Sequence, residues 1–179
     1  MYVDAGGDGI DVNGSWNMTG GTVIVSGPTD NGNGALDYDG TFNITGGTLI
    51  AAGSSGMAQA PSNTSTQVSI KATFSGAKSA NSLVHLEDAQ GNDVMTFAPS
   101  KAYQSIIIST PDLVKGDSYK LYTDGTAEGT EKDGLYTEIT DYKDGTLAYE
   151  ISLTDIVTSA GNGSQIGPGG NGNPNQRPW

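Results

Sequence analysis

Five aspartates near the start of the chain carry its clearest potential chemistry: Asp8, Asp11, Asp30, Asp37 and Asp39. Carboxylates, together with the backbone carbonyls of Gly/Asn-rich turns, are ligands that calcium prefers. Residues 1–70 contain no lysine or arginine that could balance these charges. The pattern therefore predicts calcium as a cofactor, with these five residues as candidate metal ligands. The alternative is that they are solvated turn residues, since turns favour aspartate without any metal.

The elements that must position these carboxylates form an internal repeat. Residues 9–27 and 35–53 align without a gap at an offset of 26 residues. In this alignment Asp37 is equivalent to Asp11, and both copies contain Thr-Gly-Gly-Thr at the same place. The apolar positions are apolar in both copies. A fixed period with turn glycines in register indicates a repeat architecture.

Within each copy the apolar residues alternate with polar ones, which is the period of a β-strand and not of a helix. Each copy therefore predicts about three short strands separated by glycine turns. Stacked copies would form the rungs of a parallel β-helix, with equivalent residues about 4.8 Å apart. The expected apolar ladders are Ile10 on Leu36, Val12 on Tyr38, Trp16 on Phe42, Met18 on Ile44 and Val23 on Leu49. Asp11 and Asp37 would point outward one rung apart and repel by about 1 kcal/mol even in water.

The chain after the repeat changes character, and three segments are predicted. Residues 1–66 are the parallel β-helix rungs, 67–158 an antiparallel β capping domain or small sandwich, and 159–179 a low-complexity tail rich in Gly, Asn and Pro. Two hairpins are expected in the capping domain. One joins 82–87 to 93–98, and the other joins 135–142 to 146–153. Ile70, 26 residues beyond Ile44, fits either a degenerate third rung or the first capping strand.

The composition limits the classes of partner and compartment. The net charge of −12 and the pI near 4.1 argue against nucleic acid or an anionic membrane as a partner. The chain has no cysteine, which excludes disulfides and thiolate metal sites, and no apolar run long enough to span a bilayer. The chain does not begin with a recognisable signal peptide, and if it is a fragment of a longer protein, that absence says little about localisation.

Residues for catalysis are scarce. The single histidine, His85, lies between Val84 and Leu86 on an expected strand, where a structural role is the better interpretation. The only arginine is Arg177 in the tail, so the repeat offers no basic residue for proton abstraction. The sequence therefore predicts a protein that is not an enzyme, with no catalytic residues.

Several segments together resemble a known bacterial family. They are residues 7–14, 19–28, 32–38 and 49–59, followed by 105–112 and 116–125. This set resembles the last rungs of the clostridial carbohydrate-binding-domain-containing β-helix proteins, and it covers most of the chain. The resemblance implies a right-handed parallel β-helix like that of pectate lyases. It also implies bound calcium and the binding of acidic, pectin-like polysaccharide without cleavage.

Three functional hypotheses follow. The first is a non-catalytic, calcium-stabilised protein that binds acidic polysaccharide in the extracellular space or at the cell surface. The second is a structural protein whose copies stack end to end into fibres through the open β-helix edge and the C-terminal tail. The third, and least favoured, is a vestigial polysaccharide lyase, because the repeat lacks the basic residues that this chemistry needs.

Overall fold

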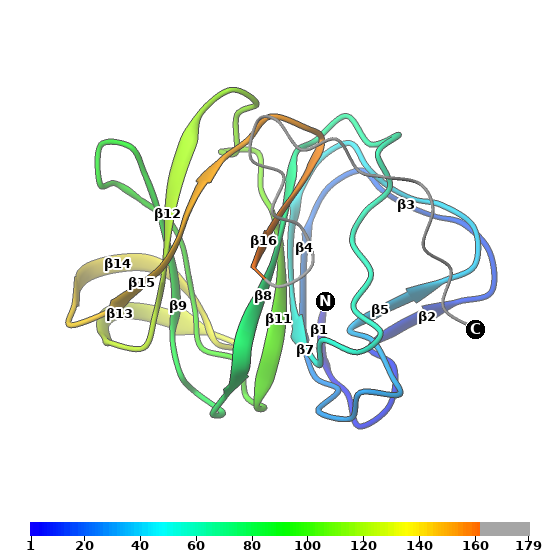
Figure 1. The fold of residues 1–179 in the computed structure, drawn as a ribbon, viewed down its shortest axis with the longest axis horizontal. Helices are drawn as coiled ribbons and strands as arrows, with labels where there is room; N and C mark the ends of the chain where they lie inside the picture. The colour runs from blue at the N-terminus through cyan, green and yellow to red at the C-terminus, as the bar shows by residue number, and fades with distance from the viewer. Residues whose placement is uncertain (162–179) are drawn as a thin grey trace, which may run out of the picture.

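The computed structural model describes residues 1–161, which fold into sixteen β-strands with no helix in that range. Figure 1 shows these strands in three layers, with one sheet shared by the two halves of the molecule. The all-β class predicted from the alternating sequence is therefore confirmed.

The middle layer is a mixed six-stranded sheet in the order β1-β4-β7-β11-β8-β16. Its strands are β1 (Tyr2–Asp4), β4 (Thr22–Ser26), β7 (Thr48–Gly53), β11 (Tyr103–Ser109), β8 (Ser69–Lys78) and β16 (Val157–Gly161). Strands β1, β4 and β7 run parallel, whereas β11 is antiparallel to both β7 and β8. The repeat and the later part of the chain are thus hydrogen-bonded into one sheet through β7 and β11.

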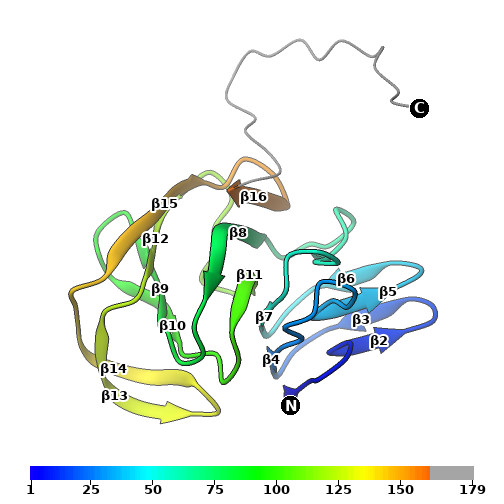
Figure 2. The ribbon, with the colours of Figure 1, turned by 60° about the horizontal axis from the view of Figure 1, so that its bottom comes forward.

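Two small parallel sheets form the layer on the repeat side. One pairs β2 (Ile10–Val12) with β5 (Leu36–Tyr38), and the other pairs β3 (Trp16–Met18) with β6 (Phe42–Ile44). Every pair, including β4 with β7, joins residues 26 apart, so the predicted ladders are confirmed. Figure 2 shows the two copies lying one above the other, with the N-terminus at the outer side.

The third layer is an antiparallel six-stranded sheet in the order β13-β14-β10-β9-β12-β15. Its strands are β13 (Thr126–Lys132), β14 (Leu135–Lys143), β10 (Asp93–Phe97), β9 (Val84–Asp88), β12 (Ser118–Thr123) and β15 (Thr146–Ser152). The predicted hairpin around residues 91 and 92 is confirmed, because β9 and β10 pair antiparallel across it.

Both faces of the middle sheet are buried, because alternate residues of each strand point to opposite sides. On β7 and β11, Ile50, Ile106 and Ile108 pack into a core shared with the antiparallel sheet. Their neighbours Leu49 and Ile107 pack into the core of the repeat. This explains the continuous apolar run at residues 106–108, which is typical of a strand covered on both faces.

The predicted parallel β-helix is more specific than what the structure shows. The sheets are mostly antiparallel or mixed, and the structure shows the all-β class but not a parallel β-helix. After two turns the repeat stops, and antiparallel β11 takes the place beside β7 where another parallel strand would lie. Ile70 lies on β8, which pairs with β11 and not with β7, so it belongs to the antiparallel part.

The second predicted hairpin is wrong. Strand β14 pairs with β13 and β10, whereas β15 pairs with β12 on the far side of the sheet. The prediction failed because β13 is a polar, exposed strand without the apolar alternation that marks a half-buried one. Its turn to β14 is the dipeptide Asp133-Gly134, whose φ angles of 56° and 84° suit a tight hairpin turn.

The predicted tail begins at residue 159, within β16, which continues to Gly161. Residues 162–179, with the part of the tail that the fibre hypothesis invokes, lie outside the described residues.

Candidate functional site

Asp11 and Asp37 are the two predicted metal ligands that the fold brings together. They are direct partners in the parallel pair β2–β5, and their flanking residues Ile10 and Leu36 pack into the repeat core. The two carboxylates therefore occupy neighbouring places on the outer face of this sheet, with Asp11 exposed and Asp37 half-buried. Gln59 Nε2 donates to Asp37 Oδ1 over 3.4 Å, which adds an amide to the row.

The other three predicted ligands lie in turns. Asp8 Oδ1 accepts a hydrogen bond from the Gly34 amide at 2.7 Å, and this bond links the first copy to the second. Asp30 Oδ1 accepts from the amide of Gly32 within its own turn. Asp39 is exposed at the end of β5, where its backbone amide donates to Val12. Asp8 and Asp30 thus already accept turn hydrogen bonds.

Within the described part of the chain, no three histidine, cysteine, aspartate or glutamate residues are grouped closely enough to hold a metal ion. Asp11 and Asp37 supply two carboxylates, whereas calcium takes six to eight oxygen ligands, at roughly 2.3–2.6 Å. Any calcium on this face would need most of its ligands from water or from a bound molecule.

A second polar row runs beside the first, on the pair β3–β6. Asn43 Nδ2 donates to Asn17 Oδ1 at 3.3 Å, and Thr64 Oγ1 donates to Asn43 Oδ1 at 2.5 Å. The two asparagines, which the 26-residue offset aligns, are therefore stacked, and Thr64 extends the row by one position. The outer face of the repeat thus carries acidic groups on one strand pair and amide and hydroxyl groups on the next.

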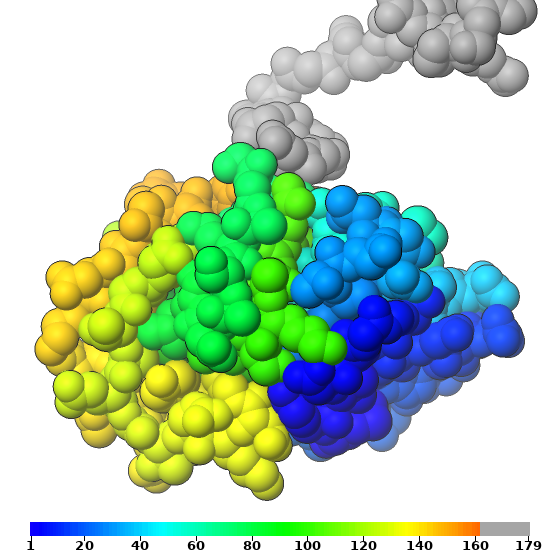
Figure 3. Space-filling model, turned by 90° about the horizontal axis from the view of Figure 1, so that it is seen from below, coloured from blue at the N-terminus to red at the C-terminus, as the bar shows by residue number. Residues whose placement is uncertain are grey.

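Trp16 and Phe42 form the predicted aromatic ladder, with ring centroids 4.1 Å apart and an interplanar angle of 10°. Phe42 is fully buried because Ser62 and its neighbours cover the side of β6 that faces away from β3, whereas Trp16 is half-buried. Figure 3 shows the first copy in blue at the surface, next to residues near 100 in green. There Lys101 Nζ lies 2.6 Å from Asp4 Oδ1 and ties β1 to the antiparallel part.

A separate acidic cavity, not anticipated from the sequence, lies at the far end of the antiparallel sheet. It has a volume of about 510 Å³, and its lining includes Asp88, Asp93, Asp112 and Asp117. Asp88 accepts from the amides of Gln90 and Asn92 and from the Asn92 side chain. The Asn92 side chain is the main cause that holds the pKa of Asp88 below its usual value. This carboxylate therefore orders the β9–β10 turn.

Lys71 and His85 are the two basic side chains whose surroundings bear on a catalytic role. Lys71 follows the lysine-free region, but its Nζ donates to the Ala58 carbonyl, and burial lowers its pKa. His85 is buried on β9, opposite Thr96 of β10. Its polar surroundings were not predicted, although the β9–β10 hairpin register could have identified Thr96 as its partner.

No helix that is long and apolar enough to cross a membrane occurs in residues 1–161. No protein-family model, curated protein or solved structure matches the chain.

Proposed function

We propose that this chain is a non-catalytic carbohydrate-binding protein whose paired repeats bind acidic, pectin-like polysaccharide through bridging calcium. In this interpretation the repeats are terminal rungs of a right-handed parallel β-helix, and the protein acts in the extracellular space or at the cell surface. The observation that carries the proposal is the in-register pair Asp11 and Asp37 on the outer face of β2–β5. The resemblance to the clostridial carbohydrate-binding proteins supports the choice of ligand.

The charge balance explains why calcium and polysaccharide would bind together. Two neighbouring carboxylates repel each other and a uronate chain, and residues 1–70 provide no lysine, arginine or histidine side chain. A calcium ion between the two surfaces would remove both repulsions. Uronate carboxylates and water would then supply the oxygens that Asp11 and Asp37 leave open. The Asn17–Asn43–Thr64 row would give the polymer further hydrogen-bonding groups on the neighbouring strand pair.

The test is a titration of the protein with polygalacturonate, in calcium and in excess chelator at matched ionic strength. We expect binding only in calcium, and we expect the double variant Asp11→Asn/Asp37→Asn to lose at least tenfold in affinity. The matched control is Asp112→Asn/Asp117→Asn, which makes the same charge change at the far cavity and should bind like the parent. An equal loss of affinity in both variants would mean that only the net charge of the protein matters. It would overturn the assignment of the binding site to Asp11 and Asp37.

Thermal unfolding separates calcium from polysaccharide. A ligand that binds only the folded state raises the melting temperature as its concentration rises. If calcium alone shifts the melting temperature but polygalacturonate does not bind, the aspartates are structural calcium ligands and the polysaccharide proposal fails. If neither effect occurs, Asp11 and Asp37 are solvated residues and the whole proposal fails.

A structural role in self-association is the second candidate, and a specific observation favours it. Strands β1, β2 and β3 are each paired on one side only, and Met1 and Tyr2 are 63% and 39% exposed. Unpaired strand edges are templates for pairing with another chain. Sedimentation velocity should then show concentration-dependent assembly, and Tyr2→Glu should reduce it because it adds negative charge to this edge. A monomer at all concentrations would exclude this role.

A vestigial polysaccharide lyase remains the least supported of the three functions. Such chemistry needs a free basic residue beside the bound uronate. Lys71, the first lysine in the chain, is half-buried and already donates to a backbone carbonyl.

A further inference from the structure

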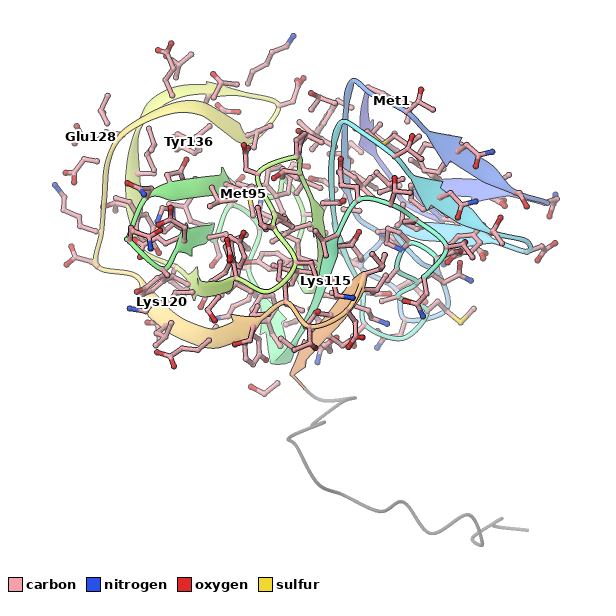
Figure 4. All side chains as sticks on the ribbon, turned by 90° about the horizontal axis from the view of Figure 1, so that it is seen from above. Met1, Met95, Lys115, Lys120, Glu128 and Tyr136 are labelled. Atoms are coloured by element: carbon pink, nitrogen blue, oxygen red, sulfur yellow. The ribbon has the colours of Figure 1, made fainter. Side chains whose placement is uncertain are left out.

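The single histidine lies inside the curled antiparallel sheet and not at its surface. Val84 and Leu86 on either side of it pack into the sandwich core, so the side chain of His85 points to the opposite face. That face is covered by the β13–β14 hairpin, which curves over β9 and β10 and is marked in Figure 4 by Glu128 and Tyr136. As a result, His85 is only 2% exposed.

Both ring nitrogens of His85 face oxygen atoms. Nδ1 lies 2.6 Å from Thr96 Oγ1 and 3.3 Å from Asp93 Oδ1, and Nε2 lies 3.1 Å from Glu87 Oε1. The Thr96 hydroxyl donates to Asp93 Oδ1 at 2.7 Å. Three residues from two strands therefore surround one imidazole ring.

The hydrogen-bond inventory favours a charged ring. An ionised carboxylate can only accept hydrogen bonds, so Nε2 must carry a proton to bind Glu87. The only hydroxyl proton of Thr96 is directed at Asp93, so Nδ1 must carry a proton as well. With the proton on Nδ1 alone, the Nε2 lone pair would face Glu87; with the proton on Nε2 alone, the Thr96 hydroxyl would have to turn to Nδ1 and Asp93 would lose the bond that it accepts. Only the imidazolium, with both nitrogens protonated, satisfies all the contacts.

The hairpin also supplies an aromatic ring that stacks on the charged imidazole. Tyr142 of β14 stacks on His85 with centroids 3.8 Å apart and an interplanar angle of 21°. Its hydroxyl donates to the Asp124 carbonyl at 3.1 Å, next to the turn that leads into β13. Burial raises the pKa of Tyr142 to about 12, with a smaller effect from the Glu87 charge, so the ring is neutral near pH 7. The face of a neutral aromatic ring attracts a charged imidazolium more strongly than it attracts a neutral imidazole.

We propose that His85 is a pH-sensitive clasp that, in its protonated form, holds the β13–β14 hairpin over the sheet. The groups that face it are Glu87 on β9, Asp93 and Thr96 on β10, Tyr122 on β12 and Tyr142 on β14. The folded contacts favour the proton on the ring. The clasp is therefore closed while the imidazole carries both protons and opens when the ring loses one of them.

Loss of the proton opens the hairpin locally. Without the proton, one nitrogen faces an acceptor and the attraction to the Tyr142 ring weakens. The other attachments of the hairpin include two β14–β10 pairs, Thr96 with Tyr136 and Phe97 with Leu135, and the bond from the Ala98 amide to the Gly134 carbonyl. Strand β13 is the edge of the sheet and largely exposed. The clasp would thus make the exposure of this edge depend on pH.

The first experiment uses nuclear magnetic resonance on the full chain labelled with ¹⁵N-histidine. The chain has one histidine, so its two ring-nitrogen signals need no assignment. We expect both nitrogens to be protonated on the acidic side of a single transition. Amide exchange in β13 and β14, corrected for intrinsic rates, should rise about tenfold across the same transition, while β8 and β11 should not change. The clasp would be overturned by a neutral tautomer on the acidic side of the transition. It would also be overturned if the corrected amide exchange rates in β13 and β14 did not change across the transition.

Two carboxylate variants keep the test independent of a folding defect at His85. Glu87→Gln keeps an oxygen acceptor at Nε2 but removes its charge, so the transition should move to lower pH. Glu138→Gln removes an exposed carboxylate from the hairpin itself and should leave the transition unchanged. Equal shifts in both variants would show a general effect of net charge. No shift in Glu87→Gln would show that the Glu87 contact does not hold the proton.

Discussion

The two copies of the repeat share their turn residues, their apolar pattern and their strand pairing, but they lie in different environments. Leu36 and Phe42 of the second copy are 1% and 0% exposed, whereas their partners Ile10 and Trp16 in the first copy are only half-buried. The first copy has a neighbour on one side. The second lies between the first copy and residues 54–67, whose Ser62 amide donates to Phe42 at 2.7 Å.

Residues 54–67 cover the second copy without forming a strand. Ser62 and Ser65 turn their hydroxyls towards it and accept from the amides of Phe42 and Ile44 at 3.0 and 3.1 Å. Side-chain oxygens thus satisfy backbone donors that a further strand would otherwise pair. The comparison shows that the contribution of a repeat residue depends on its stacking neighbours as much as on its type. Substitutions at equivalent positions can measure that difference.

The largest contrast is expected at the stacked aromatic pair. Phe42→Ala should lower the free energy of unfolding by about 3–5 kcal/mol, because it empties a closed site in the core. Trp16→Ala should cost about half as much, although tryptophan is larger, because its side chain is already partly in water. Urea unfolding of both variants gives the two values. Equal losses would mean that the first copy is covered in solution by something outside residues 1–161.

Gly14 and Gly40, which lie two residues before β3 and β6, give a second, sharper contrast. A Cβ at Gly40 would lie 2.5 Å from Ser15 Oγ and 2.8 Å from the Gly14 carbonyl oxygen, whereas a Cβ at Gly14 meets nothing within 4 Å. Gly40→Ala should therefore destabilise by about 1–3 kcal/mol through overpacking. Gly14→Ala should be close to neutral.

The two alanine variants change the unfolded chain in the same way, so their difference isolates the contact between copies. Thermal and urea unfolding of both would check it. If Gly14→Ala is as harmful as Gly40→Ala, the cause is backbone conformation and not the stacking of the second copy on the first.

The sequence was sufficient to predict the repeat and its register. The identical Thr-Gly-Gly-Thr blocks allow only one alignment, and a slip by one residue would turn every apolar side chain outward. The ladders, the stacked asparagines and the place of Asp11 beside Asp37 all follow from that alignment. The β9–β10 hairpin was also predictable, because its turn residues lie between two alternating segments.

The remainder depended on contacts between distant parts of the chain. Nothing in residues 48–53 indicates that β11, more than 50 residues later, will pair with β7 and end the parallel stack. Strand β13 has no buried face to give it an apolar pattern, and Asp133-Gly134 was the only local signal for it. The surroundings of His85 come from β9, β10, β12 and β14, so its lone position in the sequence could not reveal its partners.

The smallest contrast is expected on the outer polar row. Asn43→Ala removes three contacts, the bond accepted from Thr64 at 2.5 Å and the weaker bonds donated to Asn17 at 3.3 Å and to Thr41 at 3.4 Å. Net hydrogen bonds of this kind contribute about 0.5–1.5 kcal/mol, and partial exposure places the expected loss near 1 kcal/mol. Asn17→Ala removes only the weaker contact at an exposed site, and a loss of a few tenths of a kcal/mol is expected. A double-mutant cycle between the two positions, measured by urea unfolding, should give a coupling below about 0.5 kcal/mol. A larger coupling would mean that the row is cooperative, with Asn17 holding Asn43 in place for Thr64.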